Sequence, residues 1–587
     1  MLNISFRFYT SHYNTFFNFV FILFIGYFAQ SIFSMSISPK KPTLFLFIYA
    51  FLLSTHLSRS FFFRHLHQHQ PVFLQIILYF TKISRIVVNS LNEWRNEILN
   101  QPNILLIMTD QLRGDCLGFA GHPDVKTPYL DTLASRGVSF DNAYSSCPSC
   151  IAARAALHTG MAQEHHRRTG YEDNIPWEYP NTMAGELSKA GYYCQCVGKM
   201  HVHPLRNYLG FHNVELHDGY LHSARYTNVP WQESQKNADD YFHWLKQEKG
   251  IDADVTDTGL ECNSWVARPW IYEEKYHPTN WVTDRSIDFL RRKDPQKPFF
   301  LMASYLRPHP PFDAPSYYFD LYNKKELAPP AVGDWETTEE LQAMGRVFDS
   351  KCGPSDPELI REAQIGYYAC ITHLDHQIGR LIQALVEYGV YDNTLILFTS
   401  DHGEELCDHH MFRKSRPYQG SIRIPMIMAG NETLLPGIKQ GTVSHSVVEL
   451  RDVMPTLLDF VKADIPDSVD GKSMLPLVQN PAEKLRDVLH GEHSYGPYSN
   501  HWLVSSYDKF IWYSETGKEQ YFRISEDPKE LHDEISNPIY KERIEELRNT
   551  LIETLKDRPE GFSDGTQLIT GCPYPPYMPD KTQKEGK

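Results

Sequence analysis

The sequence predicts an α/β/α sandwich, in which helices cover both faces of a mostly parallel central sheet, followed by a small α+β C-terminal subdomain. Short uninterrupted apolar runs that end in polar residues are typical of buried parallel strands. These runs alternate with amphipathic helical stretches, as in α/β folds. After about Arg486 the pattern changes to alternating aromatic residues and then one charged helix. With 587 residues, 42% of them hydrophobic, the chain can bury one large core and one smaller core.

Four of the predicted strands lead into residues suited to chemistry. These strands and the residues that follow them are 103–109 with Asp110, 192–198 with Lys199, 297–306 with His309, and 393–400 with Asp401. Ligand sites in open α/β sheets lie at the carboxyl ends of the strands. We therefore expect one site at this edge of the sheet.

The predicted helices follow from apolar residues at three- and four-residue spacing. In the first of them, within 127–138, we expect Thr127 as N-cap, Pro128 at the first helical position and Gly137 as the stop. Further helices are predicted within 181–192, 365–390 and 447–461, and a further strand within 421–430. The C-terminal part reads as an aromatic hairpin over 501–513 and a helix within 537–557.

The chain divides by composition into residues 1–100, a main domain at 101–480, and a C-terminal subdomain with its tail at 481–587. The first acidic residue is Glu93, and residues 1–90 hold about half of the 33 Phe. Residues 16–33 are uncharged for about the length that spans a bilayer. This segment is either a membrane anchor or upstream sequence read from a wrongly assigned start. In the first case the protein is membrane-anchored or exported, and in the second it is cytoplasmic.

The formal net charge of −15 argues against a nucleic-acid binder. An anionic ligand must therefore be held by a few local cations. The ten cysteines show no disulfide framework. Cys147 and Cys150 form a CxxC pair, but no second pair completes a four-thiolate zinc site, and the surroundings are unlike a thioredoxin centre.

The stretch from Cys150 to Gly160 resembles the first signature of the sulfatase family, which belongs to the alkaline-phosphatase-like superfamily. The signature is Cys-x-Pro/Ala-x-Arg followed by a spaced Leu and Thr-Gly. The matching residues are Cys150, Ala152, Arg154, Leu157, Thr159 and Gly160. The resemblance extends over about residues 101–560 and implies the α/β/α sandwich already predicted. Cys147 does not fit the signature, because the residue four positions after it is Ile151 and not the required Arg.

The resemblance implies that a maturating enzyme oxidises Cys150 to formylglycine (3-oxoalanine). The hydrated aldehyde offers one hydroxyl that attacks sulfur and a second that later expels sulfate. Arg154 then holds the nucleophile in place. The start of a helix suits this position, since free N–H groups and the helix dipole favour a bound anion.

The resemblance also implies a divalent metal held at two strand ends. The corresponding residues are Asp110 with Gln111, and Asp401 with His402. Oxygen ligands suit Ca²⁺, our first choice, or Mg²⁺, whereas His402 tilts the preference toward Mn²⁺, iron or zinc. The Asp-Gln and Asp-His combination also resembles phosphonate and phosphodiester hydrolases related to sulfatases.

The second signature of the family resembles the stretch that ends in Lys199 and His201. By matching, both contact the nucleophile and the sulfate, and Lys414 also contacts the sulfate. His309 matches a histidine on the leaving-group oxygen and takes the general-acid role. We predict that Lys199, Lys414 and the metal stabilise the developing charge.

We therefore predict a sulfuric ester hydrolase acting on a small-molecule or oligosaccharide sulfate ester. The alternatives are a phosphonate monoester or phosphodiester hydrolase with the same site, and a catalytically silent binding protein in which Cys150 is unmodified. The His-rich stretches 164–168 and 408–410 are interpreted as pocket rim or solvated surface. Candidates for the rest of the pocket are Arg206, His165 and His501.

Overall fold

The computed structural model describes residues 101–219, 239–336, 351–353 and 356–578. The Phe-rich segment at 1–90, with its predicted anchor, lies outside these residues. Within the described part of the chain, no helix is both long and apolar enough to cross a membrane.

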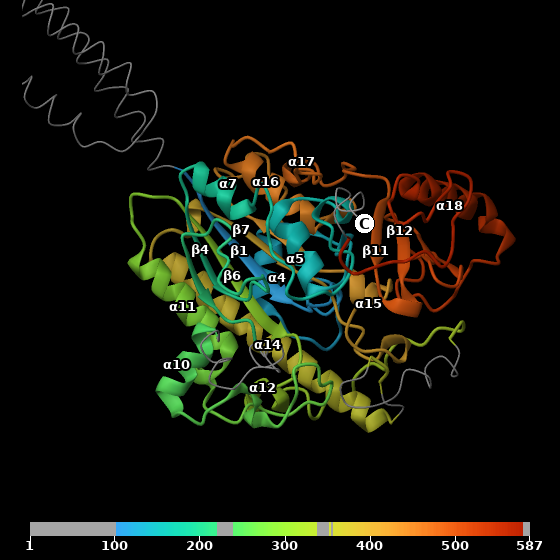
Figure 1. Cartoon of the computed structure of the whole chain (residues 1–587). Helices are drawn as coiled ribbons and strands as arrows, with labels where there is room; N and C mark the ends of the chain where they lie inside the picture. Colours follow the sequence, from blue (N-terminus) through green and yellow to red (C-terminus); the bar gives the residue numbers. More distant parts are fainter. Residues whose placement is uncertain (1–100, 220–238, 337–350, 354–355, 579–587) are drawn as a thin grey trace, which may run out of the picture. The chain divides into compact units, whose positions relative to one another are not determined.

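The main sheet has eight strands in the order β5-β4-β6-β1-β7-β8-β2-β9. Figure 1 labels β4, β6, β1 and β7 of this sheet. The five strands from β5 to β7 are parallel, whereas β8 runs antiparallel to both of its neighbours. The strands are β1 Asn103–Asp110, β2 Gly137–Phe140, β4 Tyr193–Gly198, β5 Asn213–Leu216, β6 Phe299–Pro308, β7 Thr394–Ser400, β8 Met426–Ala429 and β9 Thr442–Ser444. The short strands β3 Ala143–Tyr144 and β10 Val448–Glu449 pair separately. The predicted mostly parallel sheet is confirmed.

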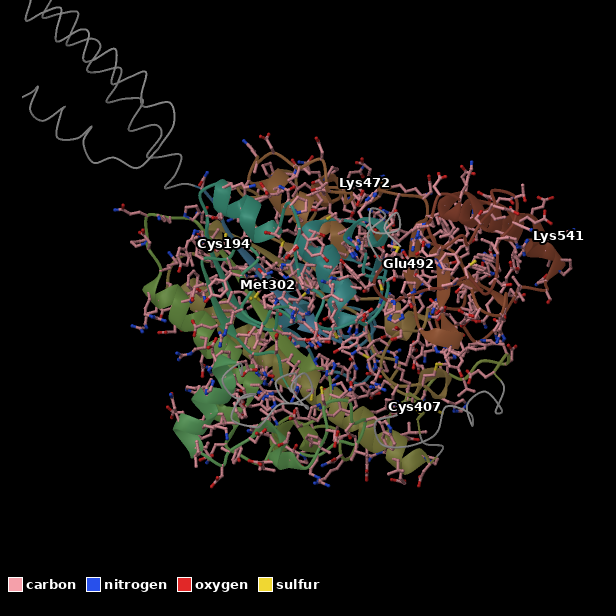
Figure 2. The ribbon with its side chains drawn as sticks, in the orientation of Figure 1. Cys194, Met302, Cys407, Lys472, Glu492 and Lys541 are labelled. Atoms are coloured by element: carbon pink, nitrogen blue, oxygen red, sulfur yellow. The ribbon has the colours of Figure 1, made fainter. Side chains whose placement is uncertain are left out.

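Helices cover both faces of this sheet, because its central strands are apolar on both sides. Along β1, Leu105 and Ile107 pack into one core, while Leu106 and Met108 pack into the other. The first core is closed by α4 Pro128–Ser135, α10 Asp240–Lys249, α11 Pro278–Arg292, α12 Ser316–Asp320 and α14 Pro357–Glu387. The second is closed by α5 Cys150–Thr159, α7 Met183–Lys189, α16 Val453–Phe460 and α17 Leu475–Gln479. Met302 of β6 belongs to the second core and lies in the interior of this α/β part (Figure 2).

A second, four-stranded antiparallel sheet follows toward the C-terminus, in the order β11-β12-β13-β14. Its elements are β11 Leu489–His493, β12 Asn500–Val504, β13 Lys509–Tyr513, β14 Glu519–Phe522 and the helix α18 Lys541–Leu555. Trp502 packs on one face of this sheet, and Leu503 packs against α18 on the other. The predicted hairpin and charged helix are both present, and the domain boundary near residue 480 stays a prediction.

The sequence misplaced some element ends. Gly137 does not stop α4, which ends at Ser135; it begins β2 instead, where an added Cβ would lie 2.4 Å from the carbonyl oxygen of Met428. Thr127 occupies the N-cap position without capping the helix, because its hydroxyl donates to Asp131. The helix predicted within 447–461 begins only at Val453.

The fold buries several neutral histidines, which should make it sensitive to acid. Burial, reinforced by nearby cations, lowers the pKa of His158, His166 and His493 to about 3. The unfolded chain protonates histidine below about pH 6.5 and the folded chain does not, so the free energy of unfolding falls as the pH drops from about 6.5 toward 3. Each group should remove about 1.4 kcal/mol per pH unit. Urea unfolding at pH 7.5 and 5.5 measures this loss.

His158→Phe provides the control for this prediction. The imidazole lies edge-on to Trp177 and Phe211, so an aromatic replacement retains apolar packing there. Between pH 7.5 and 5.5 we expect the free energy of unfolding to fall less in the variant than in the parent. The difference should be roughly the contribution of one histidine. An unchanged pH dependence would contradict the assignment.

Candidate active site

Four neighbouring parallel strands carry the predicted site residues at their carboxyl ends. In the sheet order β4-β6-β1-β7, Lys199 follows β4, His309 follows β6, Asp110 ends β1 and Asp401 follows β7 (Figure 1). The backbone joins them as well, because His309 N donates to Asp110 O at 3.0 Å and Asp401 N donates to Thr109 O at 3.1 Å. The parallel pairing therefore gathers residues that lie up to about 300 positions apart in the sequence.

Cys150 is the first residue of α5 and points into this edge of the sheet. Its Sγ lies 3.2 Å from His402 Nε2 and 3.8 Å from Asp110 Oδ1, and the residue is only 2% exposed. Burial and Asp110 raise the pKa of the thiol, but the charges of Lys199, Lys414 and His402 outweigh them and bring it below its ordinary value. The site thus stabilises negative charge at this position.

Arg154 lies one helical turn after Cys150 and ties three strand ends together. Its Nε donates to Asp401 Oδ2 at 3.0 Å, and its Nη1 donates to Lys199 O at 2.8 Å and to Ser304 Oγ at 3.0 Å. The guanidinium is completely buried. A fully buried cation with this set of partners fixes the start of α5 against β4, β6 and β7.

Asp110 and Lys199 form a buried ion pair beside Cys150. Burial raises the pKa of Asp110, but Lys199, His309 and His402 hold it well below the usual range. Burial lowers the pKa of Lys199, and the charge of Asp110 reverses that effect and raises it. Both groups are therefore charged at neutral pH.

Gln111, Lys414 and His309 form a chain of hydrogen bonds on the other side of Asp110. Lys414 Nζ donates to Gln111 Oε1 at 2.7 Å and lies 3.2 Å from His309 Nε2. Nδ1 of His309 lies 2.8 Å from Pro310 O, which can only accept, so Nδ1 carries a proton. Burial and then Lys414 lower the pKa of His309 well below its usual value. The resting imidazole is neutral, and its Nε2 accepts from Lys414.

A metal-binding arrangement lies between the ends of β1 and β7. One ligand atom from each of Asp110, Cys150, Asp401 and His402 lies within 4.8 Å of the others. Nδ1 of His402 donates to Gly403 O at 2.9 Å, which directs Nε2 toward the cluster. Asp401 and Cys150 raise the pKa of His402 despite its burial, so a proton and a cation compete for its Nε2. These carboxylate, imidazole and thiol groups fit a divalent ion.

Two positioning carboxylates escaped sequence analysis. Glu404 accepts from Gln111 Nε2 and from the backbone N–H of Arg413, so it joins a candidate metal ligand to the loop that carries Lys414. Asp218 accepts from the backbone N–H groups of Met200 and His201 at 2.9 and 3.0 Å. Only the acidic pair Glu404 and Glu405, three and four residues after Asp401, could have pointed to Glu404.

Replacing Glu404 should impair turnover more than stability. In Glu404→Gln an NH₂ group replaces one of the two accepting carboxylate oxygens, so only one acceptor oxygen remains for the Gln111 Nε2 and Arg413 N–H donors. The Gln111 amide then loses its fixed orientation. We expect kcat to fall about 10- to 100-fold, the usual effect of a residue that orients a metal ligand. Steady-state kinetics on an aryl sulfate, together with thermal unfolding, measures both effects.

Glu405→Gln is the matched control. Glu405 is also fully buried, and burial raises its pKa well above the ordinary value, which favours the uncharged form that an amide resembles. An isosteric amide should leave kcat within about threefold of the parent. Equal losses in the two variants would contradict the role given to Glu404.

Several predicted residues lie away from this cluster or pack elsewhere. The ring of His201 packs edge-on to Tyr171 at 5.8 Å, and Arg206 pairs with Asp240. His165 pairs with Asp470, and His501 is fully buried against Trp512 and Tyr574. The stretches 164–168 and 408–410 are not solvated surface at their buried members, which are His166, Arg168 and His409. Their interpretation as pocket rim stays a prediction.

Comparison with known proteins agrees with this geometry. Residues 102–463, which contain Cys150 and the residues described around it, match the sulfatase family. The chain belongs to the sulfatase family. Residues 407–557 also match the C-terminal part of N-sulphoglucosamine sulphohydrolase. An arylsulfatase of Clostridium perfringens is 52% identical over 473 residues, which are 81% of this chain and 98% of that protein. This sulfatase is therefore a sulfuric ester hydrolase.

Solved structures share the sulfatase fold. A phosphonate monoester hydrolase of Agrobacterium radiobacter superposes with a TM-score of 0.62 at 25% identity, over 77% of this chain and 95% of that one. The structure of BT4656 in complex with its substrate D-glucosamine-2-N,6-O-disulfate gives a TM-score of 0.62 at 21% identity, over 78% of this chain and 98% of that one. The sandwich predicted from the strand pattern is confirmed.

Proposed function

We propose that this sulfatase hydrolyses sulfate esters of aryl or carbohydrate alcohols through a formylglycine made from Cys150, with a divalent metal beside it. One observation carries the proposal. Cys150 begins α5 within 3.8 Å of both Asp110 and His402, where Lys199, Lys414 and His402 lower the pKa of its thiol. A group that must become an anionic nucleophile gains from this environment.

The residues around Cys150 are suited to hold a nucleophile and a sulfate group. A formylglycine hydrate at this position supplies one hydroxyl to attack sulfur and a second to release sulfate. Lys199 holds positive charge at the nucleophile, and Arg154 fixes the start of α5 so that the attacking atom keeps its direction. The N-terminus of α5 adds favourable dipoles for the sulfate oxygens.

The departing alcohol takes its proton from the Lys414 and His309 pair. The neutral resting His309 accepts from Lys414, so its Nε2 first has to gain that proton before it can act as general acid. A negatively charged ester beside His309 raises the imidazole pKa and favours this transfer. Lys414 thus serves the proton pathway as well as the sulfate charge.

The metal would be held by Asp110, Gln111, Asp401 and His402. A divalent ion held there would polarise the ester and stabilise negative charge on the attacking oxygen. Three oxygen-bearing side chains favour Ca²⁺, with Mg²⁺ as an alternative. The imidazole of His402 favours Mn²⁺.

Metal preference should depend on His402. In metal-stripped protein we expect the thermal unfolding midpoint to rise by several degrees with the preferred ion. His402→Asn should reduce the gain from Mn²⁺ and retain the gain from Ca²⁺, because an amide oxygen replaces the imidazole nitrogen. A midpoint that no divalent ion raises would contradict a metal site here.

The mass of the peptide that carries Cys150 tests the proposal. Protein made with a sulfatase-maturating enzyme should give a peptide about 18 Da lighter than the cysteine form, or its hydrate, and should hydrolyse 4-nitrophenyl sulfate. Protein made without the enzyme should keep the thiol and remain inactive. A thiol that persists in both preparations would refute formylglycine catalysis and favour a silent binding protein.

A phosphonate or phosphodiester hydrolase is the second candidate. Gln111 and His402 favour it, since they replace the acidic and amide ligands expected of a sulfatase, and a phosphonate monoester hydrolase shares the fold. Comparing kcat/KM for 4-nitrophenyl sulfate and for the phenyl phosphonate monoester separates the two activities. A ratio above one for the sulfate supports the proposed assignment.

A further inference from the structure

A second group of cations lies beside Lys414. Lys351 Nζ donates to Ser415 Oγ at 3.2 Å and stands 3.5 Å from the ring centre of Tyr495. The guanidinium of Arg416 stands 3.7 Å from the ring centre of Tyr498. Lys351 thus joins the loop that carries Lys414 to the segment that follows β11.

The charges in this cluster have the same sign. The pKa of Lys351 lies well below its ordinary value. Burial is the largest cause, and the positive charges of Arg413, Lys414 and Arg416 lower the pKa further. Among the described residues, no carboxylate lies within ion-pair distance of the Lys351 or Lys414 ammonium groups. In a chain of net charge −15, such a concentration of cations costs free energy that a bound anion would recover.

The cluster is accessible and continuous with the reaction site. Lys351 is half-buried, and Tyr495 and Tyr498 flank the exposed Gly496 and Pro497. Lys414 contacts Gln111 and His309 in the reaction site, and the next residue, Ser415, contacts Lys351. An anion at Lys351 would therefore sit next to the sulfate that Lys414 holds.

We infer that Lys351, with Lys414 and Arg416 beside it, forms a second anion subsite that holds another sulfate or carboxylate group of the same substrate. This inference rests on the proposed function, in which the scissile sulfate ester lies at Cys150. The subsite would direct the enzyme toward saccharides that carry at least two acidic groups. A substrate with a single sulfate would use only the reaction site.

Binding to an inactive variant tests the subsite without turnover. In a Cys150→Ala background, calorimetry compares glucosamine 6-O-sulfate with glucosamine 2-N,6-O-disulfate. We expect the disulfate to bind about 10-fold more tightly, the usual gain from one charge-assisted contact. Adding Lys351→Met should abolish this preference and leave the affinity for the monosulfate unchanged. Lys351→Glu should reverse the preference.

A matched control and the opposing outcomes separate the subsite from the proposed function. Lys541→Met removes a lysine at the outer edge of α18 and should retain the preference (Figure 2). The inferred subsite would be overturned if the Cys150→Ala parent bound both sugars equally tightly. It would also be overturned if Lys351→Met weakened the binding of both sugars equally. Failure of the wild-type protein to hydrolyse 4-nitrophenyl sulfate would overturn the proposed function alone, since the binding data remain valid.

Discussion

Cys150→Ala should abolish sulfate-ester hydrolysis. If formylglycine at this position is the nucleophile, its removal leaves only binding and electrostatic stabilisation, and kcat should fall by about 10⁴-fold or more. The fold should survive, because the side chain is small and its immediate neighbours are held by Arg154 and Lys199. Turnover of 4-nitrophenyl sulfate by matured protein, with circular dichroism as a check on folding, measures the effect.

Cys147→Ala is the control for that experiment. Cys147 is equally buried and lies three residues earlier, but burial raises the pKa of its thiol well above the ordinary value, so it stays protonated. We expect near-normal kcat and a small loss of stability. If Cys147→Ala were the inactive variant and Cys150→Ala retained turnover, the assignment of the nucleophile would be wrong.

Lys414→Met should reduce kcat about 10²- to 10³-fold, the effect of removing one preorganised donor from a developing negative charge. The ammonium group donates to Gln111 Oε1 and to His309 Nε2, so its removal also takes away the proton that His309 needs. Lys414 is only half-buried, and the thermal midpoint should change little. Steady-state kinetics and thermal unfolding of the variant measure both.

The leaving group supplies an internal check on the Lys414 prediction. An alcohol of low pKa departs without a proton, whereas an alkyl alcohol needs one. Lys414→Met should therefore lose more rate on a sugar sulfate than on 4-nitrophenyl sulfate. Equal losses on both substrates would show that Lys414 acts on the sulfate charge and has no part in the proton pathway.

The strand ends were predictable because one rule of α/β folds decides them. Apolar runs that end in Asp110, Lys199, His309 and Asp401 must place those residues at one edge if the strands are parallel. The sheet order β4-β6-β1-β7 makes those four ends immediate neighbours. The spaced signature distinguished Cys150 from Cys147 without any structural information.

The hydrogen bonds that orient these groups could not be predicted, because they depend on loop conformation. Glu404 contacts Gln111 across 293 residues, and no periodic pattern marks such a pair. The neutral state of His309 follows from its burial and from Lys414, which sequence spacing does not reveal. Gly137 reads as a helix stop in the sequence because the close approach of Met428 is visible only once β2 and β8 pair.

If Cys150 is converted to formylglycine as proposed, its burial limits when that conversion can take place during biosynthesis. Cys150 is only 2% exposed, and Arg154 holds the start of its helix against three strands. An oxidising enzyme therefore cannot reach this side chain once the chain has folded. Under the proposed function, conversion would compete with folding of the new chain, and slower synthesis should raise the converted fraction. Maturating enzyme added to the folded, unconverted protein should leave the thiol intact, and efficient conversion there would contradict this order of events.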